Sequence, residues 1–285
     1  MEDRQTEKLA KFLSTLEYDE MPFGIFYSDT EPSEGITPDV ADLPTREKEQ
    51  KNEIDWQNLF SHFTCVIGAV WRARKKHLPA YFDAGHFGCP GGAFFLGFMK
   101  PQTETMIKYV SSGIPGYMEG ELYIESPDEL RRIFEYIDPR PAPKKYCILK
   151  PLDLFASTEE PELVSFFARP EVICGLHQLA AFVTHDAEVV ASPWGAACTN
   201  LIGWPLRYLE KGQPRAVLGG WDPSARKFFK NDELSFTVPY KMFLDMLERF
   251  EGSFLLQKTW PIVRKKIGRS KRVWGEEGAS SRDEQ

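Results

Sequence analysis

Two cysteines lie where the sequence has the features of a helix start. Cys89 stands in GHFGCPGGAFFLGF, directly before Pro90, and Cys198 stands in GAACTNLIGWPL. The backbone N–H groups of a first helical turn have no partner within the helix, so this position favours a thiolate over a thiol. A cysteine there could be a nucleophile, a metal ligand or one wall of an anion-binding pocket.

Packing alone also explains these residues. Cysteine is small and apolar, and it is among the residues most often buried. Gly91 and Gly92, which follow Pro90, could let a ligand approach the backbone or only let the helix pack closely against a strand. Cys147, in the strand-like segment KYCILK, is assigned to the core.

Soft-metal binding is a second chemistry that these side chains permit. The candidate ligands are Cys65, Cys89, Cys174 and Cys198. His62 lies three residues before Cys65, His177 lies three after Cys174, and His86 lies three before Cys89. Sulfur and imidazole at such spacings bind zinc and other soft metals. The histidines do not match between the cysteine pairs, however, so a zinc ion or an iron–sulfur cluster is an alternative rather than the first hypothesis.

Support for other catalytic chemistry is weak. The sequence has no G-x-S-x-G elbow, no G-x-x-x-x-G-K-[ST] loop and no H-E-x-x-H motif. Asp83, just before the first cysteine turn, is interpreted as a loop or capping residue rather than a general base. Trp194 and Trp221 lie beside turns and could form walls of a pocket.

Parts of the sequence recur. ELYIESPDELRRIFEYID begins at Glu121 and ELSFTVPYKMFLDMLERF begins at Glu233, and each pattern predicts a short strand, a proline and a helix. Cys65 and Cys89 also have the same separation as Cys174 and Cys198. The first cysteine of each pair lies in a helical pattern, and a short strand (LPAYFDAG, AEVVASPW) precedes the second. These parallels predict an internal duplication.

The elements predict an α/β or α+β fold in which two related halves pack together and helices cover a mixed sheet. The first half spans residues 18–140 and contains a polar loop insertion at 28–53. The proline-rich segment DPRPAPKK links it to the second half at 145–252. Residues 253–285 form a C-terminal extension, with a disordered tail from about residue 269.

The composition narrows the class of partner. The 285 residues carry a formal net charge of −7 and are 42% hydrophobic, as in soluble globular proteins. The negative charge argues against nucleic acid or an anionic membrane as a partner. No apolar run approaches the ~20 residues that span a bilayer, and the N-terminus does not resemble a signal peptide. Five cysteines, an odd number, suit a reducing compartment, so we expect a cytoplasmic protein of undetermined oligomeric state.

Several segments together resemble one family. They are MPFGIFYSD, CPGGAFFLGF, EGELYIESPDELRRIFEYI, KYCILKPLD, PELVSFFARPEVICGLHQLA, GAACTNLIGWPL and the long segment that closes with DELSFTVPYKMF. From about Met21 to Lys266 the chain is similar to the bacterial and archaeal domain of unknown function 169. The resemblance implies a soluble prokaryotic protein, with Cys89 and Cys198 as the motif cysteines and Cys65 in a helix, and it brings no reaction with it. The insertion at 28–53 departs from the pattern expected of the family.

Three functions are compatible with these observations. The first is a binding protein whose two cysteine turns face a cleft between the halves and hold a small anionic ligand or cofactor. Its expected contacts are Cys89, Gly91, Gly92, Cys198 and Thr199, with His86 and Trp194 as walls. The second is a thiol-dependent, metal or iron–sulfur redox enzyme that uses Cys89 or Cys198. The third is a non-catalytic interaction subunit.

Overall fold

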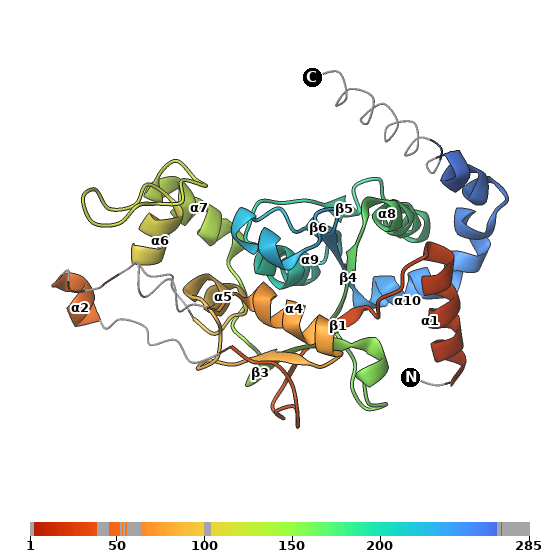
Figure 1. The fold of residues 1–285 in the computed structure, drawn as a ribbon, viewed down its shortest axis with the longest axis horizontal. Helices are drawn as coiled ribbons and strands as arrows, with labels where there is room; N and C mark the ends of the chain where they lie inside the picture. Colours follow the sequence, from red (N-terminus) through yellow and green to blue (C-terminus); the bar gives the residue numbers. More distant parts are fainter. Residues whose placement is uncertain are drawn as a thin grey trace, which may run out of the picture.

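A single mixed sheet forms the centre of the molecule. The computed structural model describes residues 3–38, 46–51, 53, 55, 64–99, 104–266 and 269. Within these residues seven strands form one sheet, and helices pack on both of its faces (Figure 1). The predicted α/β class, with a mixed sheet covered by helices, is confirmed.

The sheet has the strand order β2-β3-β1-β4-β7-β6-β5. The strands are β1 (Phe23–Ser28), β2 (Ala80–Phe82), β3 (Tyr146–Pro151), β4 (Leu163–Ala168), β5 (Val190–Ala191), β6 (Ala216–Gly219) and β7 (Leu234–Pro239). Neighbours are antiparallel except for β5 and β6, which are parallel.

The helices lie between and around these strands. They are α1 (Asp3–Leu16), α2 (Arg46–Gln50), α4 (Val66–Lys76), α5 (Pro90–Phe95), α6 (Glu104–Val110), α7 (Pro127–Ile137), α8 (Pro170–Thr184), α9 (Trp204–Glu210) and α10 (Tyr240–Arg249). Short 3₁₀ turns are η1 (Leu152–Leu154), η3 (Pro223–Phe228), η4 (Phe250–Gly252) and η5 (Phe254–Leu256), and η2 (Thr199–Gly203) is a π-helix. None of the helices in the described ranges has both the length and the apolarity needed to cross a membrane.

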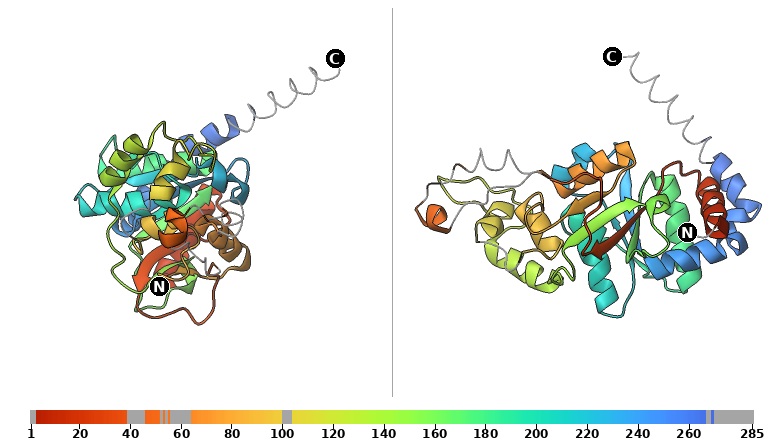
Figure 2. Two further views of the ribbon diagram at one scale, coloured as in Figure 1. Left: turned by 90° about the vertical axis from the view of Figure 1, so that its left-hand side faces the viewer. Right: turned by 90° about the horizontal axis from the view of Figure 1, so that it is seen from below.

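Each face of the sheet has its own apolar core. The alternation of side chains along a strand sends Val164 and Phe166 of β4 into the core formed with α1, α8 and α10. Leu163 and Phe167 point the other way, into the core formed with α4, α5, α6, α7 and α9. All six residues of β4 are buried, as expected of a strand in the middle of a covered sheet. Figures 1 and 2 show α1, α8 and α10 at one end of the molecule and α6 and α7 at the other.

The predicted strand–helix repeat is only half right. The segment from Glu233 forms β7 and then α10, as predicted. The segment from Glu121 forms α7 but no strand, because residues 121–126 are loop and turn. Leu122 has a φ of 53°, in the left-handed region that a strand residue does not adopt. The predicted strand at 121–126 is therefore wrong.

The two cysteine pairs also differ in position. Cys65 is the residue before α4, whereas Cys174 lies inside α8 and is exposed. The strands predicted before the second cysteines are present as β2 and β5. Strands from both predicted halves belong to one sheet, and the internal duplication stays a prediction.

The segment at 28–53 contains α2. The tail after 269 and His62 lie outside the described residues.

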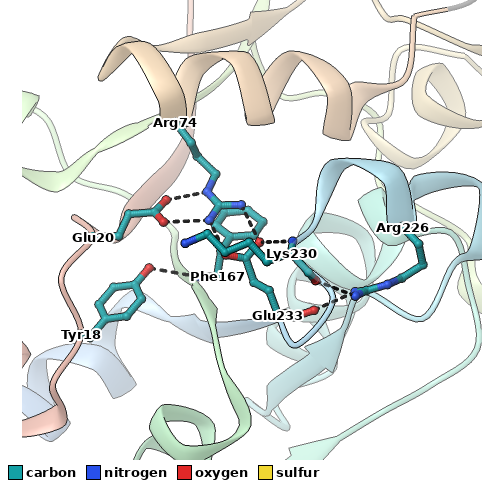
Figure 3. A network of polar contacts seen from close by, with 7 residues as sticks. All are labelled: Tyr18, Glu20, Arg74, Phe167, Arg226, Lys230 and Glu233. Atoms are coloured by element: carbon teal, nitrogen blue, oxygen red, sulfur yellow. Dashed lines mark hydrogen bonds and ion pairs between the residues drawn. The ribbon is translucent and has the colours of Figure 1, made fainter. Parts of the chain in front are cut away.

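A buried ion network joins α4 to the segments that precede β1 and β7 (Figure 3). Arg74 of α4 donates hydrogen bonds to both carboxylate oxygens of Glu20 and to both of Glu233. Its guanidinium stacks on the ring of Phe167 at 4.1 Å. Burial alone would lower the pKa of Arg74, but the two carboxylates raise it above its ordinary value. The guanidinium of Arg74 and the carboxylates of Glu20 and Glu233 are all paired, so we interpret this network as structural.

Candidate functional site

A cavity of about 580 Å³ opens on the face of the sheet that α4, α5 and α6 cover. The N-terminal ends of α4 and α5, one side of α6 and the turns at 192–196 and 221–224 form its wall. Three cysteines line it: Cys65, Cys89 and Cys198. Trp194 and Trp221 line it and are also exposed to solvent, which places them at its open side.

Cys89 is held by the turn that begins α5. It is the N-cap residue, and Pro90 occupies the first helical position, where its missing N–H leaves no bond unmade. The Sγ of Cys89 accepts a hydrogen bond from the backbone N–H of Gly92 at 3.3 Å. The predicted helix start is confirmed, and the thiol itself caps it.

The two glycines after Pro90 differ in the space that a side chain would have. A Cβ on Gly92 would lie 2.7 Å from the carbonyl oxygen of Phe87 and 2.7 Å from Cγ2 of Val66, so only glycine fits there. A Cβ on Gly91 would lie 3.1 Å from Cε of Met106, the movable end of a flexible side chain. Gly92 therefore allows α5 to pack on α4, whereas Gly91 leaves space on the cavity wall.

The other two thiols come from separate elements. Cys65 is the N-cap residue of α4, but its thiol forms no capping hydrogen bond with the helix. Cys198 is buried and directly precedes the π-helix η2. Such π-helical turns are rare and often occur at functional sites. The three thiols lie close enough for Cys65 and Cys89 to act on the pKa of Cys198.

Burial decides the protonation of these thiols. It raises the pKa of Cys89 to about 12, and the proximity of Cys65 adds to the effect, which the N–H groups of Gly92 and Gly91 reduce only in part. Burial also raises the pKa of Cys198 and of Cys65. The thiolate that the sequence suggested at the helix start is therefore not favoured, because the cost of burying charge exceeds the stabilisation by the helix end.

The structure brings together six of the residues predicted for the site and leaves out three. Cys65, Cys89, Gly91, Gly92, Trp194 and Cys198 line the cavity. His86 instead pairs with Asp83, whose Oδ1 also accepts hydrogen bonds from the N–H groups of Gly85 and His86, so Asp83 has the loop role that was one of the two expected. Thr199 is buried behind the wall, and Cys174 is exposed on α8. Among the described residues, no group of three or more His, Cys, Asp or Glu is arranged to hold a metal ion.

The acidic side of the cavity, which includes Glu121, was not predicted from the sequence. Glu121 and Tyr123 line it from the loop at 121–126, with Tyr109 of α6 beside them. Leu122, between the first two, has the left-handed φ given above and is exposed. Glu121, Tyr123 and Tyr109 are all visible in the sequence. A strand was predicted at 121–126, however, and a strand gives no reason to expect these side chains to meet in one cavity.

Glu121 is a carboxyl group that holds its proton unusually well. Burial, followed by the nearby charge of Asp222, raises its pKa to about 7, although a hydrogen bond with Tyr109 acts in the opposite direction. A carboxyl group poised near neutral pH in a cavity is typical of a functional site.

A comparison with family models places this site in a known domain. The model described as "Uncharacterised ArCR, COG2043" matches residues 11–249. The chain belongs to the DUF169 family. No curated protein and no solved structure matches it. Every residue that lines the cavity lies within the matched range, so the cavity belongs to the DUF169 domain rather than to either terminal segment.

Asp222 fixes the remaining wall of the DUF169 cavity. Its Oδ2 accepts a hydrogen bond from the N–H of Ala197 at 3.2 Å, and its Oδ1 accepts from both N–H and Oγ of Ser224. One carboxylate thus ties the turn before Cys198 to the turn that begins η3. Trp204 Nε1 supports the same wall by donating to the carbonyl oxygen of Trp194 at 2.8 Å.

Proposed function

We propose that this DUF169 chain binds a small molecule in the cavity between α4, α5, α6 and the turns at 192–196 and 221–224. The observation that carries the proposal is the cavity itself. Its volume of about 580 Å³ lies in the range of small-molecule sites, which are mostly apolar with a few convergent polar groups. Phe95, Val110 and Phe134 supply apolar wall, and Glu121 and Asp222 supply the polar groups.

In this proposal the thiols of Cys65, Cys89 and Cys198 form part of the cavity wall and do not react. With pKa values raised by burial they stay neutral at physiological pH, and a neutral thiol is a weak nucleophile. Cysteine then serves as a small, polarisable surface against which a ligand packs. Binding is therefore better supported than thiol chemistry.

The structure also changes the expected charge of the ligand. A small anion was expected at the cysteine turns, but the N–H of Gly92 is already bonded to Cys89, and α5 is a helix of six residues. Two carboxyl groups stand on the wall. These features support a neutral or cationic ligand more than an anion.

A neutral fluorescent probe tests the proposal. 1-Aminoanthracene should bind saturably with one site per chain and quench the tryptophan emission to which Trp194 and Trp221 contribute. Gly91→Leu should weaken this binding by about tenfold or more, because its side chain fills the space beside Met106.

Gly252→Leu is the matched control, since nothing lies within 4 Å of a Cβ at Gly252 and the position is remote from the cavity wall. It should bind the probe as the wild type does. Failure of the wild type to bind the probe, or equal binding by Gly91→Leu with an unchanged unfolding temperature, would contradict the proposal. An absence of binding would favour the interaction subunit instead.

Two finer hypotheses accompany the proposal. An internal duplication is supported by the similar sequence patterns around Pro127 and Pro239, each of which is followed by a helix, although the segment before Pro127 is not a strand. A cytoplasmic location is supported by the five cysteines, which all lie in the described residues and are free.

A further inference from the structure

The hydrogen-bond donors on the cavity wall are largely engaged with the protein. Trp221 Nε1 donates to Oγ of Ser192 at 2.9 Å, and that hydroxyl donates to the carbonyl oxygen of Leu218 at 3.1 Å. The hydroxyl of Ser224 donates to Asp222 at 2.7 Å. These three donors are therefore already used within the protein.

Among the described residues, one acceptor on the same wall has no hydrogen-bond partner. Asn200 lines the cavity and is 1% exposed, and its Oδ1 accepts no hydrogen bond from that part of the chain. Its amide nitrogen donates to the carbonyl oxygen of Pro193 at 2.9 Å, which fixes the orientation of the side chain. A buried acceptor without a donor is costly. The oxygen itself has almost no surface open to the cavity, so the polar contacts of a ligand are made by Glu121 and Asp222.

The charges point the same way. Glu121 and Asp222 are both carboxyl groups, and the electrostatic effect on Glu121 from the described residues comes from Asp222 and not from a cation. Lys227, also on the wall, acts instead on Cys65 and lies over the ring of Phe228 at 5.1 Å. Within the part of the chain that the structure describes, no cation acts on Glu121, so this side of the cavity has negative character.

Aromatic side chains complete the arrangement. Tyr109 and Tyr123 flank Glu121, and Trp194 and Trp221 line the open side. The faces of such rings attract cations, and the attraction grows where water is excluded.

We propose that the ligand is an organic cation that bears N–H donors, a protonated amine on an aromatic or apolar body. The ammonium group lies against Glu121 and Asp222 among the aromatic rings, and the apolar body packs on the thiols. This inference rests on the proposed function, because it names the ligand class for the same cavity.

Three compounds that share one ring system separate charge from shape. 2-Naphthylmethylamine, 2-naphthalenemethanol and 2-naphthoate are titrated by calorimetry and by displacement of 1-aminoanthracene. The amine should bind about tenfold more tightly than the alcohol, since charge-assisted hydrogen bonds are about twice as strong as neutral ones, and the carboxylate should bind least.

A pair of variants assigns the preference to one side chain. Glu121→Gln should bring the amine to within about threefold of the alcohol. Glu125→Gln removes the same charge four residues away, at an exposed position off the cavity wall, and should keep the tenfold preference.

The pH dependence is an independent readout. Tyr109, Tyr123 and Asp222 are the titratable groups that interact with Glu121. Because the pKa of Glu121 is about 7, its ionisation should tighten amine binding as the pH rises from about 6 to 8, while the amine stays protonated. Glu121→Gln should show a flat profile.

The outcomes distinguish the two levels of the proposal. If the alcohol or the carboxylate binds as tightly as the amine, the ligand class is wrong and the binding function stands. If Glu125→Gln and Glu121→Gln lose the preference equally, the assignment to Glu121 is wrong. If none of the three compounds nor 1-aminoanthracene binds, the proposed function itself is wrong.

Discussion

The backbone N–H of Gly92 donates a hydrogen bond to Sγ of Cys89 across 3.3 Å. This bond uses an amide that could otherwise have held an anion, and it makes the thiol part of the structure of the turn. Because the sulfur also lies on the cavity wall, largely removed from bulk water, burial rather than the helix end controls its proton. The relationship explains why a cysteine at a helix start need not be a nucleophile.

The first prediction concerns alkylation of the cysteines. At about pH 7.5 iodoacetamide should modify Cys174 first, because it is exposed on α8. Cys89 and Cys198 should react much more slowly, because burial holds their pKa values far above that pH. Peptide mass spectrometry after timed quenching measures each site in the same sample. Labelling of Cys89 as fast as that of Cys174 would restore the thiol-enzyme hypothesis.

Much of the fold could be predicted from local patterns. The Glu233 segment alternates apolar side chains and then changes to helical spacing after Pro239, and it forms β7 and α10. Cys89 followed by Pro90 indicated a helix start, and α5 begins there. These predictions hold because a strand period, a helix period and a proline each act over a few residues.

The acidic side of the cavity could not be predicted in this way. The Glu121 segment has nearly the same pattern as the Glu233 segment, but Leu122 adopts a left-handed φ that no alternation reveals. The raised pKa values depend on burial and on the charges of residues distant in sequence, Cys65 for Cys89 and Asp222 for Glu121. Likewise, equal cysteine spacing suggested that Cys65 and Cys174 were equivalent, but spacing does not say where a helix begins. Cys65 precedes α4, whereas Cys174 lies inside α8 and is exposed.

The second prediction compares the two glycines of the cysteine turn. Gly92→Ala should lower the free energy of unfolding by about 1 to 3 kcal/mol, because its Cβ would lie 2.7 Å from a backbone oxygen that cannot move freely. Gly91→Ala should cost less than about 1 kcal/mol, because the end of Met106 can shift. Urea unfolding of both variants measures the difference. Equal costs would show that the packing of α5 on α4 is looser than described.

The third prediction is a pH-dependent change in stability at Glu121. Its folded-state pKa of about 7 lies above the ordinary 4.5, so the folded protein holds this proton between those pH values and the unfolded chain does not. The stability of the wild type relative to Glu121→Gln should therefore fall as the pH rises through this window. Above about pH 7 the variant should be more stable by about 1 to 2 kcal/mol, after allowance for solvent screening.

Thermal unfolding at about pH 4.5 and pH 8 measures this difference, with Glu125→Gln as the control for loss of an exposed charge. The two proteins should coincide at the acidic pH. A difference between wild type and Glu121→Gln that does not change with pH would show that Glu121 is better solvated than its position on the cavity wall indicates.

The fourth prediction concerns the ion pair between Arg74 and Glu233, whose side chains are 8% and 3% exposed. Arg74→Met leaves Glu233 buried without its cation and should lower the free energy of unfolding by about 3 to 5 kcal/mol. The double variant Arg74→Met, Glu233→Met should cost less than the sum of the single changes, because Glu233 is then no longer buried without its cation. A double-mutant cycle by urea unfolding measures the coupling, which should be at least about 1 kcal/mol. Strict additivity would mean that Glu20, the second partner of Arg74, accounts for the stability of the network.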